Sequence, residues 1–385
     1  MDQIRLFILM DGVGWRHLQQ TDFAEQLCPY RKPLKTILGY SSGAVPTILS
    51  GKMPAETRQW GMWFYSPATS PFGWASRRVR YPRFVKRLRG ISRDTVVAGF
   101  KERHQITGYC EVYRIPDELL PLLDTCAKRS LYQPKSLGDV ESIFDIWTRA
   151  GVDYAVFGYP TPDWQSLSEV TEGIRRTPKS TYFMHLYETD AFLHARCKDA
   201  EAFRALLHSY ERGLERLCAE AREGGATVDL CIFSDHGMTP TAGECDVMRS
   251  IEQLGLRSGR DYVPLYDSTM ARFWFLDPHA EAPVVRALQT VEHGRILPAE
   301  ELRRLGIFFP DAQYGQLIFL MEPGWIINPS HMGTTAPVGM HGFHPDEDPW
   351  SDAVLLSTRP IPDHVEHIAD LFGLMQPDCG PQAAR

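Results

Sequence analysis

Short apolar runs that lead to chemically reactive residues recur along this sequence, and they constrain its fold more than any other feature. Four of the five runs are followed by an aspartate or a serine, and the fifth ends at a glycine. In chain order, the runs and the residues that follow them are Ile4 to Met10 with Asp11, Leu34 to Leu38 with Ser41, Val152 to Phe157 with Gly158, Tyr182 to Tyr187 with Asp190, and Val228 to Phe233 with Asp235. Continuous apolar runs of this length are typical of strands buried on both faces, as in a mostly parallel sheet.

Segments in which apolar residues recur at helical spacing separate these runs. Ile143, Ile146 and Trp147 show this spacing before one run. The longest such pattern precedes the last run and consists of Phe203, Leu206, Leu207, Tyr210, Leu214 and Leu217. The alternation predicts an α/β fold with a mostly parallel central sheet flanked by helices. Because ligand groups in such folds collect at the carboxyl ends of strands, we expect the residues that follow the runs to lie together.

The alternation is interrupted twice. With 385 residues, the chain is long enough for one large α/β domain that carries insertions. Residues 63–140 are aromatic, basic and rich in proline, and we interpret them as a cap inserted into a metal-binding core of residues 1–62 and 141–385. Within that core, residues 239–315 are irregular around a strand-like run from Met270 to Leu276, which indicates an accessory lobe.

The cap region supplies many aromatic side chains. They are Trp60, Trp63, Phe64, Tyr65, Phe72 and Trp74. Such residues either pack the cap against the core or stack on a ring of a substrate, and packing is the more common use. A basic stretch follows from Arg77 to Arg89, which is either a solvated helix face or a wall that attracts an anionic substrate or membrane surface.

Charge and cysteine content narrow the classes of partner and the compartment. A net charge of −7 gives no reason to expect a nucleic-acid polymer as partner. The eight cysteines are scattered without paired motifs, which favours reduced thiols and a cytoplasmic location. The apolar run that starts at Ile4 is too short for a signal peptide, and no stretch approaches the roughly 20 apolar residues that span a bilayer.

Six residues with metal-binding side chains follow the runs or lie in glycine-rich loops. They are Asp11, Asp190, His194, Asp235, His236 and His341. Taken singly, each has an ordinary structural explanation, such as a turn or a helix cap. Asp190 and His194 are four residues apart, so a helical turn places both on one face. Three carboxylates and three imidazoles together suit Zn²⁺, with Mn²⁺ as an alternative, and are numerous enough for two ions.

The segment from Leu38 to Pro54 resembles the nucleophile region of the alkaline phosphatase superfamily. Gly51 lies ten residues after Ser41, which is the spacing in that superfamily between the nucleophile and the glycine of a Thr-Gly-like pair. The metal-binding residues also occur in the order of the superfamily. The most similar branch is the group of type I phosphodiesterases and nucleotide pyrophosphatases.

This resemblance implies a two-metal site with a serine nucleophile. The two expected ligand sets are Asp11, Ser41, Asp235 and His236 for one ion, and Asp190, His194 and His341 for the other. Ser41 is expected to attack phosphorus and form a covalent intermediate, since metal coordination activates a serine hydroxyl. Ser42 is the alternative nucleophile, and His344 is expected to orient a neighbouring residue.

The sequence therefore predicts a metal-dependent phosphodiesterase or pyrophosphatase that hydrolyses a small phosphate ester or nucleotide derivative. The alternatives are a phosphomonoesterase and an enzyme that transfers a phosphoryl or nucleotidyl group on the same scaffold. A non-catalytic binding protein is disfavoured because every expected type of ligand residue is present. Neither the natural substrate nor the oligomeric state follows from the sequence.

Overall fold

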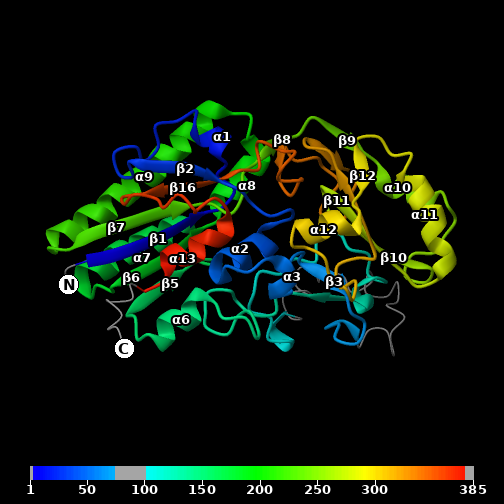
Figure 1. Ribbon diagram of the computed structural model, residues 1–385, viewed down its shortest axis with the longest axis horizontal. Coiled ribbons are helices and arrows are strands. Elements are labelled where there is room, and N and C mark those ends of the chain that lie inside the picture. Colours follow the sequence, from blue (N-terminus) through cyan, green and yellow to red (C-terminus); the bar gives the residue numbers. More distant parts are fainter. Residues whose placement is uncertain (1–2, 74–100, 378–385) are drawn as a thin grey trace, which may run out of the picture.

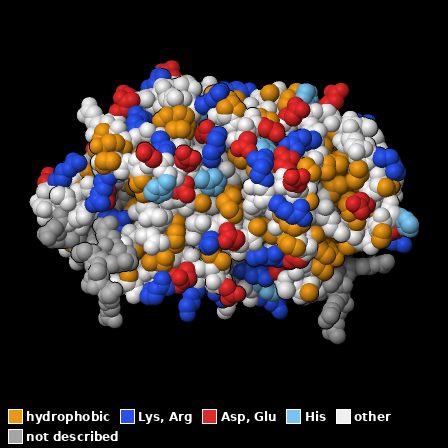
Figure 2. All heavy atoms as spheres, in the orientation of Figure 1, with side chains coloured by type: hydrophobic (Ala, Val, Ile, Leu, Met, Phe, Trp, Pro, Cys, Tyr) orange, Lys and Arg blue, Asp and Glu red, His pale blue; other side chains and the backbone are white. Residues whose placement is uncertain are grey.

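The chain folds around two β-sheets that lie side by side (Figure 1). The structure is a computed structural model that describes residues 3–73 and 101–377. Trp74 and the basic stretch from Arg77 to Arg89 lie outside the described residues. In the described part of the chain, no helix is both long enough and apolar enough to cross a membrane. Figure 2 shows acidic, basic and hydrophobic side chains interspersed over one face of the molecule.

The central sheet has six strands and confirms the predicted fold class. Their order across the sheet is β2 (Tyr30–Leu34), β16 (Ala353–Ser357), β7 (Thr227–Phe233), β1 (Gln3–Met10), β6 (Thr181–Leu186) and β5 (Tyr154–Phe157). Strands β7, β1, β6 and β5 pair in parallel, whereas β16 is antiparallel to both β7 and β2. The sheet is therefore mixed, with β16 as its one reversed strand.

Helices cover both faces of the central sheet, which explains the continuous apolar runs. The helices are α2 (Ser41–Ser50), α6 (Ile143–Arg149), α7 (Asp163–Arg176), α9 (Ala200–Glu223) and α13 (Leu371–Met375). Leu6 and Ile8 of β1 share a buried cluster with residues of α7 and α9. Phe7 and Leu9 point to the opposite face and share a cluster with residues of α2, α6 and α13. Each fully buried side chain of this kind stabilises the fold by about 1.5–3 kcal/mol.

One predicted strand is shifted in the structure. Strand β2 ends at Leu34, whereas the sequence predicts a strand from Leu34 to Leu38. Ile37 and Leu38 are buried in the connection to α2, where they pack under that helix. A short apolar run shows that a segment is buried, but it does not distinguish a strand from a buried connection.

The second sheet is antiparallel and lies beside the first. Its strand order is β10 (Tyr262–Tyr266), β11 (Met270–Phe275), β13 (Leu317–Met321) and β12 (Gly294–Ile296). Helices α10 (Val247–Glu252) and α11 (Glu281–Leu288) pack with it in one hydrophobic cluster. This sheet contains the strand expected near Met270, and it extends past residue 315 because β13 pairs with β11. The predicted division into domains stays a prediction.

The described part of residues 63–140 packs on the second sheet. Strands β3 (Trp63–Tyr65) and β4 (Leu123–Thr125), which are far apart in the sequence, form a small antiparallel pair in this region. Trp63 and Leu123 share a buried cluster with Val263 of β10. The aromatic side chains here therefore contribute mainly to packing.

Shorter elements connect the longer ones and complete the fold. They are α1 (Trp15–Leu18), α3 (Pro54–Thr57), η2 (Leu120–Leu122), α8 (Glu188–Arg196), β8 (Thr239–Pro240), β9 (Gly243–Cys245), η3 (Pro278–Ala280), α12 (Ala299–Arg304), β14 (Trp325–Ile327), β15 (Gly339–Met340) and η4 (Ile368–Asp370). Of these, α8 and the segment after β15 matter most for function because both supply predicted metal ligands.

Candidate metal centre

The carboxyl ends of three adjacent parallel strands bring the predicted ligands together. Asp11 follows β1 directly, and Asp235 follows β7 after one residue. Helix α8 starts just after β6 and carries Asp190 and His194 on its first two turns. Since β1 pairs with both β6 and β7, these segments emerge side by side.

The first group consists of Asp11, Asp235 and His236, and we call it the serine-side cluster. One potential ligand atom from each residue lies within 4.8 Å of those of the others. His236 Nε2 is 3.5 Å from Asp11 Oδ1 and 3.3 Å from Asp235 Oδ2. All three residues are buried. The backbone N–H of Gly12 donates to Asp235 Oδ1 at 3.3 Å, which helps to fix the carboxylate.

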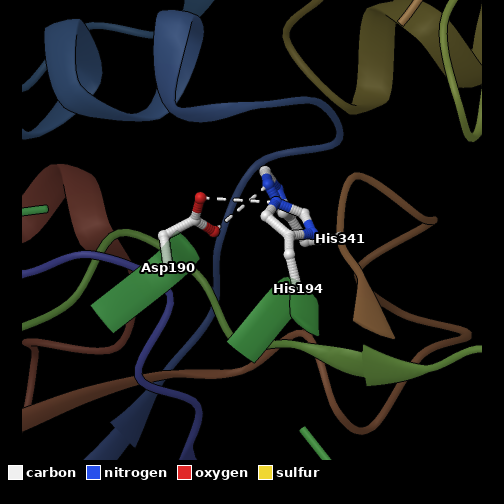
Figure 3. A group of neighbouring side chains, drawn as sticks. All are labelled: Asp190, His194 and His341. Atoms are coloured by element: carbon white, nitrogen blue, oxygen red, sulfur yellow. Dashed lines mark ion pairs between the residues drawn. The ribbon is translucent and has the colours of Figure 1, made fainter. Parts of the chain in front are cut away.

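The second group consists of Asp190, His194 and His341, and we call it the histidine-side cluster. Figure 3 shows the Asp190 carboxylate pointing toward both imidazole rings. His194 Nε2 lies 3.3 Å from Asp190 Oδ2, and His341 Nε2 lies 3.6 Å from Asp190 Oδ1. His341 follows β15 directly, so a segment far along the chain completes this group.

The two clusters are adjacent. The rings of His236 and His341 stack with their centroids 3.7 Å apart and an interplanar angle of 11°. Six of the seven predicted ligand residues thus form two touching groups, and the seventh, Ser41, adjoins the first. The structure thus brings together the residues of each expected ligand set, and their binding of metal stays a prediction.

Backbone carbonyl groups orient two of the three imidazoles. His236 Nδ1 lies 3.0 Å from Gly237 O, and His194 Nδ1 lies 2.8 Å from Gly339 O. A carbonyl oxygen only accepts, so Nδ1 carries a proton in each ring and Nε2 is the nitrogen left to bind a metal. In both rings Nε2 is the atom that faces the carboxylates, which is the orientation that metal-binding histidines adopt.

Electrostatics distinguish the two clusters. Burial, together with the charges of Asp235 and Asp190, raises the pKa of Asp11 well above its usual value. Burial acts to raise the pKa of Asp190, but the neighbouring histidines His194, His341 and His236 together outweigh burial and lower this pKa. The pKa of His194 is in turn raised, because the Asp190 carboxylate outweighs the effect of burial. The serine-side cluster therefore holds carboxylates that repel one another. In the histidine-side cluster, the negative charge of Asp190 is stabilised by neighbouring histidines.

Buried atoms without partners test whether the clusters fit metal ions. Among the described residues, Asp235 Oδ2, Asp190 Oδ1 and His341 Nδ1 are buried and make no hydrogen bond. A buried polar atom without a partner costs about 1–3 kcal/mol, so proteins rarely keep several together without a ligand. Carboxylate oxygens and imidazole nitrogens are donors that divalent zinc prefers. The residues present therefore fit two divalent cations.

Ser41 is the first residue of α2, and its hydroxyl faces the serine-side cluster. Its Oγ lies 3.0 Å from His236 Nε2 and 3.4 Å from Asp11 Oδ1. Ser42 points elsewhere, since its hydroxyl donates to the backbone oxygen of Trp60 at 2.8 Å. The Ser41 hydroxyl therefore faces the predicted metal ligands and that of Ser42 does not, while the choice of nucleophile stays a prediction.

Close packing fixes the turn that precedes Ser41. Gly39 has a φ of +129°, and a Cβ atom at this position would lie 2.6 Å from Trp60 Nε1. The Trp60 indole N–H donates to Leu38 O at 2.6 Å, and the side chain is 1% exposed. Only glycine is compatible with this backbone and this contact. Trp60 therefore holds the turn before Ser41 in place, and its side chain is used for packing.

Four tyrosine side chains from separate segments of the chain contact one another in a row. Tyr109 meets Tyr159 edge to face at 5.1 Å, and Tyr159 meets Tyr187 at 5.6 Å. The hydroxyl groups of Tyr109 and Tyr113 are 3.4 Å apart. Burial raises the pKa of both Tyr109 and Tyr113, and the Asp190 charge contributes to the same shift. This tyrosine row (Tyr109, Tyr113, Tyr159 and Tyr187) was not singled out from the sequence, where no spacing connects its members.

His344 contacts a different set of partners from the predicted ligands. Its Nε2 lies 3.0 Å from Glu301 of α12, and its Nδ1 accepts the backbone N–H of Asp346 at 3.2 Å. Glu301 also forms a two-bond ion pair with Arg295, at 2.6 and 2.7 Å. His344 therefore ties the segment after His341 to the second sheet, and its predicted orienting role stays a prediction.

The sequence analysis missed His185, which lies behind Asp11. His185 is buried in β6 at the position paired with Leu9, and its Nε2 is 3.0 Å from Asp11 Oδ2. Its Nδ1 is hydrogen-bonded to the Tyr132 hydroxyl. Burial lowers the pKa of His185 to about 4. The available signal was a histidine inside the apolar run from Tyr182 to Tyr187, because a buried strand rarely carries a polar residue without a partner.

Comparison with solved structures identifies the class of fold. The murine ectonucleotide pyrophosphatase/phosphodiesterase 5 (ENPP5) superposes with a TM-score of 0.65 at 14% sequence identity, covering 97% of this chain and 94% of the murine one. The human ENPP5 gives the same TM-score and coverage at 13% identity. An inactive variant of the murine protein, solved in complex with AMP, matches equally well. At these identities the similarity shows the fold, which is that of the alkaline phosphatase superfamily.

The fold and the paired acid–histidine clusters define a phosphoric ester hydrolase. The sequence profile of the type I phosphodiesterase/nucleotide pyrophosphatase family matches residues 44–344, and the chain belongs to this family. The matched region includes the histidine-side cluster, Asp235 and His236, but it begins after Asp11 and Ser41. No curated protein sequence matches the chain significantly.

Proposed function

We propose that this chain is a two-metal phosphodiesterase or pyrophosphatase that cleaves a small phosphate ester through a covalent intermediate on Ser41. The observation that carries the proposal is the approach of Ser41 Oγ to His236 and Asp11 within the serine-side cluster. The ring stack between His236 and His341 brings the second cluster next to this hydroxyl. Membership of the family supports the choice of phosphoric ester chemistry.

Two divalent cations are part of the proposal, with zinc as the proposed metal and manganese as the alternative. Ser41 and the serine-side cluster would hold one ion, and the histidine-side cluster would hold the other. When bound, the ions supply positive charge that stabilises the attacking and leaving oxygens of a displacement at phosphorus. The buried carboxylate oxygens Asp235 Oδ2 and Asp190 Oδ1, which make no hydrogen bond, support this assignment.

The side chains present account for two displacements at phosphorus. Ser41 Oγ loses its proton and bonds to phosphorus while the bond between phosphorus and the leaving oxygen breaks. The oxygen of a water molecule then attacks the same phosphorus, the bond to Oγ breaks, and the serine regains a proton. Because Ser41 is the first residue of α2, the positive end of that helix favours the negatively charged phosphate oxygens.

The tyrosine row supports a substrate that carries a ring. The charge of Asp190 acts on the pKa of Tyr109 and Tyr113, and Tyr109 is 48% exposed, so the row combines proximity to this charge with access to solvent. Aromatic side chains stack favourably on flat rings such as nucleobases. The murine relative was solved with AMP, and a nucleotide derivative is accordingly the substrate class that we propose.

Replacement of the two neighbouring serines tests the proposal. Ser41→Ala should reduce turnover of bis-p-nitrophenyl phosphate by about 10³-fold or more, since it removes the nucleophile of a covalent mechanism. Ser42→Ala is the matched control, and it should retain most of the activity because its hydroxyl bonds only to Trp60 O. Both variants should keep bound metal. If Ser42→Ala lost activity and Ser41→Ala kept it, Ser42 would be the nucleophile.

Two further assays separate the alternative activities. A phosphomonoesterase would prefer mono-p-nitrophenyl phosphate, whereas the proposed enzyme should turn over the bis ester faster, because the diester requires room for a second ester arm. A transferase would pass the phosphoryl or nucleotidyl group from Ser41 to an added alcohol. A product mixture without the alcohol adduct supports hydrolysis.

The proposed partner is a small anionic substrate, and the proposed compartment is the cytoplasm. The seven described cysteines are all free thiols in the structure, which is compatible with a reducing compartment. Fractionation of cells that express the chain from its native gene tests the location. Recovery of the protein outside the cytoplasm would contradict it.

A further inference from the structure

A buried histidine and a buried tyrosine form a short chain of hydrogen bonds that ends on Asp11. His185 lies in the centre of the sheet on β6 and is 6% exposed. Its Nε2 is 3.0 Å from Asp11 Oδ2, and its Nδ1 is hydrogen-bonded to the hydroxyl of Tyr132. Tyr132 belongs to the connection between β4 and α6, within residues 63–140. Two segments distant in sequence thus meet behind one candidate metal ligand.

The two oxygens of Asp11 face different groups. Oδ1 is 3.4 Å from Ser41 Oγ and 3.5 Å from His236 Nε2, so it faces the serine-side cluster. Oδ2 faces away from that cluster, toward His185. A donor fixed at Oδ2 orients the carboxylate so that Oδ1 is the oxygen presented to the serine-side cluster.

We propose that His185 and Tyr132 are positioning residues for the metal site, and that they hold Asp11 so that it binds the cation of the serine-side cluster through Oδ1 alone. This inference rests on the proposed function, since it assumes a cation at that cluster. His185 donates from Nε2 to Asp11 Oδ2, and Tyr132 donates its hydroxyl proton to His185 Nδ1. Neither residue touches the substrate or the nucleophile.

Tyr132 matters because a neutral imidazole has one N–H and one acceptor nitrogen. Without a hydroxyl donor at Nδ1, the proton of His185 could move to Nδ1, and Nε2 would then present a lone pair to the Asp11 carboxylate. Two facing acceptors repel each other, so Asp11 would rotate and Oδ1 would leave its position beside the serine-side cluster. Tyr132 therefore selects the one tautomer of His185 that is compatible with a bound cation.

The surrounding chain is shaped to admit this tyrosine. A Cβ atom at Gly158, directly after β5, would lie 2.9 Å from Cζ of the Tyr132 ring. The ring also contacts His185 edge to face, with the centroids 5.8 Å apart. Because Tyr132 belongs to the predicted cap and His185 to the core, the position of the cap segment is coupled to the metal site.

Titration of the metal-free protein with zinc against a chromogenic chelator tests the inference without any assay of turnover. Tyr132→Phe removes only the hydroxyl group and should weaken one of the two zinc equivalents by about 10-fold, as loss of a residue that orients a metal ligand typically does. The matched control is Tyr154→Phe, because the Tyr154 hydroxyl bonds to Thr148 at 2.8 Å and not to the metal site. The control should bind both equivalents as the wild type does.

A double-variant comparison separates positioning from a general loss of packing. His185→Gln keeps a side-chain N–H donor near Asp11 but has no ring tautomer to select. Tyr132→Phe should therefore have little further effect on zinc affinity when it is added to His185→Gln. Additive effects of the two substitutions would show that Tyr132 acts by packing alone, and would overturn the tautomer argument.

The outcomes of these experiments distinguish a failure of the positioning role from a failure of the proposed function. If Tyr132→Phe is folded by circular dichroism and binds both zinc equivalents with wild-type affinity, the positioning role is wrong and the proposed function stands. If the wild-type protein binds no zinc or manganese, the proposed function fails, and the positioning role fails with it. If the affected equivalent in Tyr132→Phe is also the one lost in Asp235→Asn, the role is assigned to the serine-side cluster.

Discussion

The two clusters of the metal centre contain similar residues but are built by different parts of the fold. The serine-side cluster comes from loops directly after two central strands, and the side chains of Asp235 and His236 are 0% and 3% exposed. The histidine-side cluster comes from helix α8 and the segment after β15, and the side chains of Asp190 and His194 are 23% and 26% exposed. One group is part of the core, and the other lies at its edge.

This difference in burial goes together with a difference in charge. The serine-side cluster has two carboxylates and one imidazole, and the raised pKa of Asp11 reflects burial and its like-charged neighbours. The histidine-side cluster has one carboxylate and two imidazoles, and His194 stabilises the ionised form of Asp190. The first cluster is therefore electrostatically unfavourable until a cation binds, whereas the second is balanced without one. We expect the serine-side cation to bind more tightly and to matter more for the stability of the protein.

The largest expected loss of activity comes from two single variants, each of which removes one predicted ligand from one cluster. Asp235→Asn should lower kcat/KM for bis-p-nitrophenyl phosphate by about 10³-fold or more, because the ion next to the nucleophile supplies several kcal/mol of stabilisation. His194→Ala should lower kcat/KM by about 10²-fold. Each variant should lose one metal equivalent, measured by inductively coupled plasma mass spectrometry.

Asp153→Asn is the control for these two substitutions. Asp153 is exposed and precedes β5, at the opposite end of the strands from the metal centre, where it pairs with Lys179. It should leave both activity and metal content unchanged. Full metal occupancy in Asp235→Asn and His194→Ala would refute the ligand sets, and equal losses of activity would contradict the difference between the clusters.

In the metal-free protein, replacing the aspartate of one cluster should raise the stability, and replacing the aspartate of the other should lower it. The folded-state pKa of Asp11 is raised, so its ionised form is less stable in the folded protein than in the unfolded chain. At neutral pH, Asp11→Asn should therefore stabilise the metal-free protein. The pKa of Asp190 is lowered by His194, so Asp190→Asn should destabilise the metal-free protein. A shift of one pKa unit corresponds to about 1.4 kcal/mol, which sets the expected scale of both effects.

Thermal unfolding in the presence and absence of a chelator measures both effects. With metal bound, Asp11→Asn and Asp190→Asn should both be less stable than the wild type, since each loses a ligand. Without metal, their melting temperatures should fall on opposite sides of the wild-type value. Equal destabilisation of both metal-free variants would show that packing outweighs charge at the serine-side cluster.

The serine-side cluster was also the easier one to predict from sequence. Asp11 and Asp235 follow long apolar runs, and the parallel arrangement of such strands places their ends together. The fold class and the strands β1, β6 and β7 follow from the same runs. Both ligand sets depended on the family resemblance, because no local pattern shows that His341 returns to Asp190 from a remote segment.

What the sequence could not show depends on contacts between distant segments. The position of Ser41 is fixed by Trp60, which packs against Gly39. His185 appeared only as one residue of an apolar run, and its partner Tyr132 lies 53 residues earlier in the chain. The pairing of β13 with β11 was likewise not visible in the sequence, because the two strands are far apart in the chain. Local periodicity identifies elements, but it does not identify partners that come together by tertiary packing.

A third acid–histidine group can be compared with the two predicted metal clusters. Its replacement should have the smallest effect on metal content and stability. Glu301, His344 and Glu347 have potential ligand atoms within 4.8 Å of one another, as in the other two clusters. Here, however, Arg295 neutralises both glutamates, at 2.6 and 2.7 Å from Glu301 and at 2.7 Å from Glu347. A guanidinium group between the carboxylates takes the place that a cation would otherwise fill.

Glu301→Gln tests this reading of the third group. It should leave the metal content at two equivalents and lower the stability by about 1 kcal/mol or less, because Arg295 is 39% exposed and such pairs contribute little. Mass spectrometry of the metal content and thermal unfolding measure the two quantities. Loss of a metal equivalent would show that an acid–histidine group binds a cation even beside an arginine. In that case the buried oxygens Asp235 Oδ2 and Asp190 Oδ1, which make no hydrogen bond and set the first two clusters apart, would no longer explain where the cations bind.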